Sequence, residues 1–165
     1  MKAFIHRHQP AISLQGAVKA GLGGVLAIAF VALLGEASGS VWLMAPFGAT
    51  CVLLFSVPAS PLSQPMNVVG GHVFSTLVGV AAVTLLPVEW WSLGLAVGIA
   101  IAGMAALRIT HPPAGADPLV VMAMGAGLDF VIFPTLLGSL ALVLIASVFH
   151  RIPPRTTYPL ELKGG

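Results

Sequence analysis

Charged residues are scarce in this sequence. They make up 7% of its 165 residues, whereas hydrophobic residues make up 58%. Soluble domains carry roughly a quarter of charged residues, so a water-soluble fold of this composition would lack the polar surface that it needs. The seven lysines and arginines form no dense basic patch, which argues against nucleic-acid binding. These shortages exclude most soluble classes and indicate an integral membrane protein.

Cysteine is nearly missing as well. Cys51 is the only one and lies within an apolar run, so the sequence predicts neither a disulfide framework nor a cysteine-built metal site. The five histidines and five acidic residues give no convincing metal set or pair of nucleophile and base. We therefore expect a protein that is not an enzyme and that has no catalytic residues, metal or cofactor.

Long apolar runs dominate what the sequence does contain. A hydrocarbon core of about 30 Å requires roughly 20 apolar residues per crossing helix. The runs cover residues 16–35, 41–57, 67–86, 91–109, 118–128 and 130–149. They predict an all-α, polytopic transmembrane bundle of about six segments at 16–150, between a segment at 1–15 and a tail at 151–165. The second and fifth runs either cross fully or re-enter.

The charges of the sequence follow one pattern along these runs. With six crossings, every cation falls at the same side of the membrane, and the set comprises Lys2, Arg7, Lys19, Arg108, Arg151, Arg155 and Lys163. Glu36, Glu89 and Asp129 fall in loops on the other side. The tendency of cations to stay inside then predicts a multi-pass inner-membrane protein with both termini in the cytoplasm.

A weak internal repeat divides the sequence near Glu89. Residues 45–53 resemble residues 112–120, and the Thr-Leu-x-Gly sequence at 76–79 recurs at 135–138. Three segments in each half would make the second half enter the membrane from the opposite side, an arrangement that is typical of transporters. Paired segments interrupted by glycine and proline also point to a site near the membrane centre.

Residues beside the two interruptions are candidates for binding. Proline breaks helical hydrogen bonding, and a helix that begins after it presents free amide groups and a positive dipole end to an anion. Histidines at membrane depth add groups that titrate near neutral pH. The candidates for substrate binding are Gly48, Ala49, Thr50, His72, His111, Gly115 and Ala116. Gly115 and Ala116 are expected to allow close approach of the backbone.

Four residues leave alternatives open. Asp117 either caps a new helix or binds a coupling proton or cation. In an anion site its carboxylate would repel the anion unless it is protonated or paired, for example with Arg108. His111 and His72 either take part in proton coupling or make structural contacts. Arg108 either extends to the headgroups or steers an anion.

The sequence resembles the HPP family of integral membrane proteins, which is named for a His-Pro-Pro motif. The resemblance rests on HPPAGADP at 111–118, PFGAT at 46–50, SPLSQPMN at 60–67, GGH at 70–72 and FP at 133–134. It extends over essentially residues 16–150 and implies a membrane transporter. Nitrite is the substrate class that it suggests, because plastid and cyanobacterial members are associated with nitrite transport.

Two functions remain in competition. The leading one is transport of a small monovalent anion, most suitably nitrite, through a channel or a proton-coupled carrier. The alternative is a structural or regulatory membrane subunit that binds a partner, or a second copy of the chain, through faces of small residues. The expected partners are thus a small inorganic anion and the lipid bilayer.

Overall fold

The computed structural model describes residues 2–161. Met1 and residues 162–165, which include Lys163 of the expected tail, lie outside the described residues. The described part contains helices and no strands. The elements are α1 (Lys2–Ile5), α2 (Leu14–Ser38), α3 (Pro46–Ser56), η1 (Pro61–Ser63), α4 (Pro65–Leu85), α5 (Trp90–Ala106), η2 (Pro112–Ala116), α6 (Asp117–Met124), η3 (Val131–Leu136) and α7 (Leu137–Phe149).

Local sequence explains where several helices begin and end. Proline occupies the first position of α3 and of α4, where its missing amide proton costs no hydrogen bond. Gly39 and Gly125 follow α2 and α6 in the left-handed conformation, with φ of 67° and 60°, which glycine adopts without strain.

Helix length separates the segments into two groups. Three helical stretches are long and apolar enough to cross a membrane: α2, α4 and Val131–Phe149, which joins η3 to α7. α5 has 17 residues, at the lower limit for a crossing. With 11 and 8 residues, α3 and α6 are too short to cross by themselves. The predicted helical membrane bundle with two interrupted segments is therefore confirmed.

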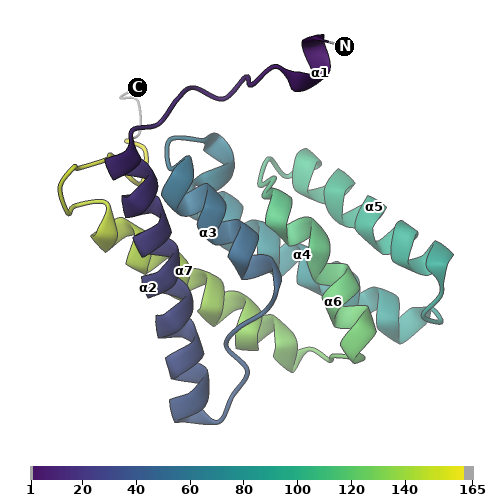
Figure 1. Ribbon diagram of the computed structural model, residues 1–165. Coiled ribbons are helices and arrows are strands. Elements are labelled where there is room, and N and C mark those ends of the chain that lie inside the picture. The colour runs from purple at the N-terminus through teal and green to yellow at the C-terminus, as the bar shows by residue number, and fades with distance from the viewer. Residues whose placement is uncertain (1, 162–165) are drawn as a thin grey trace.

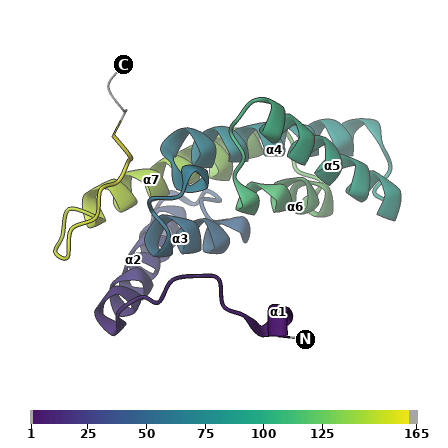
Figure 2. The ribbon, with the colours of Figure 1, turned by 90° about the horizontal axis from the view of Figure 1, so that it is seen from above.

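The two halves pack in matching ways. α3 and α6 lie in front of α4 and α7, while α2 and α5 flank them (Figures 1 and 2). In the first half α2 packs on α3, and in the second half α5 packs on α6. Across the halves, α4 contacts α5 and α6, and α7 contacts α2 and α3. Each contact has a counterpart, which agrees with the three-plus-three repeat.

Two glycines at matching positions of the repeat let the halves approach each other. A Cβ atom added at Gly79 of α4 would lie 2.8 Å from the Cα of Pro118 in α6. One added at Gly138 of α7 would lie 2.8 Å from the carbonyl oxygen of Trp42, just before α3, and 2.5 Å from the Phe47 ring. Each long helix thus receives the short segment of the other half at a glycine.

The start of the first long helix contacts the segment that follows the last helix. The Lys19 ammonium in α2 donates hydrogen bonds to the carbonyl oxygens of Ile152 and Pro154, at 2.6 and 2.5 Å, and lies 5.5 Å from the centre of the Phe149 ring. The start of α2 and the end of α7 therefore lie at one end of the bundle (Figure 1).

Candidate functional site

Four polar side chains from different parts of the chain converge in the interior. Thr50 comes from α3, His72 from α4, His111 from the residue before η2, and Asp117 from the first turn of α6, and all four are fully buried. Thr50 Oγ1 lies 2.8 Å from His72 Nε2 and 3.0 Å from His111 Nε2. His72 Nδ1 lies 2.8 Å from Asp117 Oδ2. We call these four residues the polar cluster.

The polar cluster continues at both ends. At one end, His111 Nδ1 lies 2.8 Å from the Leu62 carbonyl oxygen in η1. At the other, the Thr76 hydroxyl donates to Asp117 Oδ2 at 3.4 Å and lies 3.1 Å from the Thr135 hydroxyl. Thr76 and Thr135 occupy matching positions of the repeat, so this hydrogen bond joins the two halves at their centre.

Asp117 is not a helix cap. The residue before α6 makes no side-chain cap bond, and the Asp117 carboxylate turns to His72 and Thr76 instead. Arg108, the partner suggested by the sequence, is exposed at the end of α5 with a φ of 59°. The capping and Arg108-pairing hypotheses were wrong because His72 on α4 faces the carboxylate. Asp117 Oδ1 is buried without a hydrogen-bond partner.

One face of α4 holds the loop that carries the His-Pro-Pro motif. The Asn67 amide donates to the Thr110 carbonyl at 2.9 Å, and the Ser75 hydroxyl donates to the Ala114 carbonyl at 2.5 Å. Between them, a Cβ atom added at Gly71 would lie 2.8 Å from His111 Cβ. Residues 67, 71 and 75 are four positions apart and therefore share a helix face. This face positions His111 against Thr50.

The remaining candidate residues lie outside the polar cluster. Gly48 is exposed, and a Cβ atom added at Gly48 or Gly115 would meet no other atom within 4 Å. The expected close approach of a ligand to the backbone at Gly115 stays a prediction, whereas Gly71 and Gly79 are approached closely by other parts of the chain. Ala49 and Ala116 line a groove beside the polar cluster.

The groove runs between α3 and the segment formed by η2 and α6. It has a volume of about 580 Å³. Most of its lining residues form pairs at matching positions of the repeat, and these pairs are Ala45 with Pro112, Pro46 with Pro113, Ala49 with Ala116, and Leu53 with Val120. The two interruptions thus form opposite walls of one mainly apolar groove.

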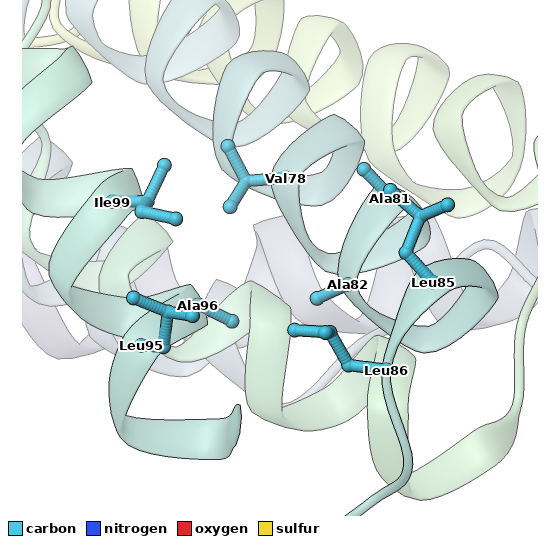
Figure 3. A pocket seen from close by; sticks show the side chains of 8 residues that line it. All are labelled: Val78, Ala81, Ala82, Leu85, Leu86, Leu95, Ala96 and Ile99. Atoms are coloured by element: carbon cyan, nitrogen blue, oxygen red, sulfur yellow. The ribbon is translucent and has the colours of Figure 1, made fainter. Parts of the chain in front are cut away.

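A smaller cavity lies apart from the polar cluster, between α4 and α5. It has a volume of about 220 Å³, and aliphatic side chains such as Val78, Leu85, Leu95 and Ile99 line it (Figure 3). No polar side chain points into it to replace the hydration of an ion. The groove and the polar cluster are therefore the better candidates for an ion site.

The fold and its polar centre define a class of protein, a polytopic helical membrane protein with two interrupted segments around buried ionisable residues. The family model described as HPP, transmembrane region, matches residues 9–159, and the chain belongs to this family. The resemblance noted in the sequence is thereby confirmed.

Two curated relatives come from Dictyostelium discoideum, and both are described as transmembrane proteins. One is 34% identical over 129 residues, which cover 73% of this chain and 42% of the relative. The other is 36% identical over 127 residues, which cover 72% of this chain and 44% of the relative. The chain thus spans less than half the length of these relatives. No solved structure matches it.

Several residues of the site were missed by sequence reasoning. Thr76 and Thr135 were noticed only as part of the repeat, although threonines at matching positions of two helices indicate that these helices contact each other there. The Leu62 carbonyl carries no sequence signal, because every residue has one. The roles of His72, His111 and Asp117 in ion coupling, and of Thr50 in substrate binding, stay predictions.

Proposed function

We propose that this protein carries a small monovalent anion across the membrane together with a proton, with nitrite as the substrate that its family suggests. The observation that carries the proposal is the buried polar cluster at the meeting point of the two interrupted segments. Ionisable side chains inside a membrane bundle are costly and usually belong to a pathway for ions or protons.

The groove beside the polar cluster supports a binding role. Interrupted backbone is tolerated at membrane depth where it lies within the protein or lines a cavity. Here Pro46 and Pro113 line the groove on opposite walls. The starts of α3 and α6 add positive dipole ends, which favour an anion. An imidazole or hydroxyl that turns from the polar cluster toward the groove would donate the hydrogen bonds.

A proton that enters with the anion reduces the electrostatic cost of transport. A lone anion in a low-dielectric interior is unfavourable, whereas an anion and a proton together carry no net charge. His72, His111 and Asp117 are the groups of the polar cluster that can hold the proton. Arg108 is exposed at the end of α5, where its positive charge would attract the anion to the protein.

The orientation in the membrane forms part of the proposal. Lys19 and the segment after α7 lie together, and Arg151 and Arg155 are exposed at the same end. We assign this end to the cytoplasm of an inner membrane, since cations accumulate there. Labelling from outside intact cells of a cysteine placed at Arg155 would contradict this orientation.

Flux measurements in proteoliposomes test the function directly. Purified protein should conduct nitrite, and nitrate and chloride serve as competing anions at two pH values. We expect nitrite flux to be faster at the lower pH, and His111→Ala to change this pH profile. Protein-free liposomes correct for passive permeation of the undissociated acid. Equal flux with and without protein would refute transport.

A second candidate function is a structural or regulatory subunit. Small residues at every fourth position of α5 face outward, and added Cβ atoms at Gly94 and Gly98 would meet nothing within 4 Å. Such a face suits close contact with a helix of a second copy. In this case Gly98→Leu would abolish oligomers in detergent, and purified wild-type protein would show no anion flux.

A further inference from the structure

The hydroxyl of Thr50 lies between two histidine rings and limits how protons are arranged around it. It lies 2.8 Å from His72 Nε2 and 3.0 Å from His111 Nε2, with the Pro46 carbonyl at 3.3 Å as a third partner. A threonine hydroxyl donates one hydrogen bond and accepts up to two. At most one of the two imidazoles can therefore accept a hydrogen bond from Thr50. Any imidazole that does not accept must donate a hydrogen bond to Thr50 instead.

The other ring nitrogens are also engaged. His111 Nδ1 faces the Leu62 carbonyl at 2.8 Å, and a carbonyl only accepts, so this nitrogen carries a proton. His72 Nδ1 faces Asp117 Oδ2 at 2.8 Å. This oxygen accepts when the carboxyl is ionised and can donate when it is protonated.

Three arrangements of protons satisfy the contacts of Thr50 with the two rings, of His111 with Leu62 and of His72 with Asp117. In the first, Thr50 donates to His111 and accepts from His72, so the contact between His72 and Asp117 requires an additional proton on either group. In the second, Thr50 donates to His72 and accepts from His111, which is then doubly protonated. In the third, Thr50 donates to Pro46 and accepts from both rings. In the first two, the Thr50 proton points to a ring and not to the Pro46 carbonyl. The net charge of the polar cluster is zero in the first two and one positive unit in the third.

The proton-free polar cluster cannot make the same contacts. With two neutral imidazoles and an ionised Asp117, both Nε2 atoms become acceptors that face a single hydroxyl proton. One of the Thr50 contacts then loses its hydrogen bond and brings two lone pairs together. The buried cluster would also carry an uncompensated negative charge. These contacts are therefore all hydrogen-bonded only when the polar cluster holds at least one proton more than in this state.

We propose that His72, His111 and Asp117 form one shared proton-binding site, and that Thr50 couples its occupancy to the contacts of α3 with α4 and with the residue before η2. Loss of the proton breaks one of the two hydrogen bonds of Thr50, either to His72 of α4 or to His111 before η2, and loosens α3 beside the groove. The consequence for transport rests on the proposed function, whereas the proton site itself does not.

The side chains that contact the polar cluster are uncharged, so the shared proton is assigned to His72, His111 and Asp117. Phe47 of α3 packs its ring edge-to-face on His72, and Thr76 of α4 and Thr135 of η3 are uncharged. Cys51, which follows Thr50 in α3, lines a cavity against α2. Lys19 interacts with the segment after α7, and His150 at the end of α7 contacts the Leu54 carbonyl of α3 at 2.8 Å and not the polar cluster.

Amide hydrogen exchange in α3, measured on the whole protein in nanodiscs at several pH values, tests the proposal. After correction for intrinsic exchange rates, protection of α3 should fall roughly three- to tenfold as the proton is lost, which corresponds to one hydrogen bond. Thr50→Val should show low protection at every pH, and Thr50→Ser should behave as wild type. Asp117→Asn, whose amide donates to His72 at any pH, should keep high protection throughout. Amides of α5 serve as the internal control.

Several outcomes overturn the proton site. One is a pH response of α3 in Thr50→Val as large as in wild type, and another is a persistent response in Asp117→Asn. If Thr50→Val does not fold, the contrast between Thr50→Ser and Asp117→Asn decides by itself. If the exchange results are as expected but the protein shows no anion flux, the proposed transport is refuted and the proton site is retained.

Discussion

The two halves of the chain share a framework but place different side chains at its centre. Gly79 and Gly138 occupy matching positions, and each lets a long helix contact the short segment of the other half. Thr76 and Thr135 also match, and their hydroxyls contact each other. By contrast, Thr50 of α3 stands where α6 has Asp117, and both contact His72 from opposite sides. The residue of the second half that matches His72 is valine, at position 131. Symmetry therefore serves packing, and departure from symmetry provides the titratable groups.

The largest expected effect comes from breaking the shared framework. Gly79→Ala and Gly138→Ala should each destabilise the protein by roughly 1–3 kcal/mol, because the added methyl group meets closely packed atoms of the opposite half. Thermal unfolding in detergent measures the loss. Gly98→Ala is the matched control, since its methyl group meets open space and favours the helix. Equal stability of all three variants would contradict the role of the two glycines.

Making the halves more alike should remove proton coupling. Asp117→Thr places in α6 the residue that α3 carries at the matching position, so the fold should tolerate it. The variant lacks the carboxylate that shares a proton with His72. Nitrite flux in proteoliposomes should then lose its dependence on pH. A pH profile equal to that of the wild type would show that the asymmetry at this position has no functional role.

The hydrogen bond between the matching threonines should reveal a smaller asymmetry. A buried hydrogen bond contributes about 0.5–1.5 kcal/mol to stability. Thr76→Val should cost more than Thr135→Val, because Thr76 also donates to Asp117. Unfolding of both single variants and the double variant gives the coupling energy between them. Additive effects would place the two hydroxyls out of contact.

The smallest effect concerns His150, which lies outside the repeated framework. Burial lowers the pKa of His150 from its ordinary value, while its hydrogen bond to the Leu54 carbonyl opposes the shift and Lys19 adds to it. Because the folded-state pKa lies below the unfolded one, His150 contributes stability at pH above about 6.5 that is lost as the pH falls. Proteolysis of residues 150–158 should become faster in acid. This response has the opposite sign to that of α3, and His150→Gln should remove it alone.

Hydropathy and proline positions predicted much of the fold. They identified the apolar segments, the two interruptions and the all-helical class, because these features depend on composition and local backbone chemistry. The weak repeat indicated that the interruptions belong together, and the structure brings Thr50, His72, His111 and Asp117 within hydrogen-bond reach.

Helix rotation limited the prediction of individual contacts. Gly48 and Ala49 precede Thr50 by one or two positions, yet they face outward because successive residues of a helix are about 100° apart. The sequence contains no direct measure of this rotation in an apolar bundle, whose faces are all hydrophobic. For the same reason the partner of Asp117 was sought along the chain, at Arg108, instead of across the bundle at His72.

Proton movement driven by a nitrite gradient tests the central claim most directly. Proteoliposomes that contain a pH-sensitive dye, with nitrite added outside, should take up protons with the anion, faster than protein-free liposomes do. Asp117→Asn should abolish the protein-dependent proton uptake, because its amide cannot release the proton that the His72 pair shares. Nitrite uptake by the wild type without protons, or unchanged proton uptake by Asp117→Asn, would contradict the account.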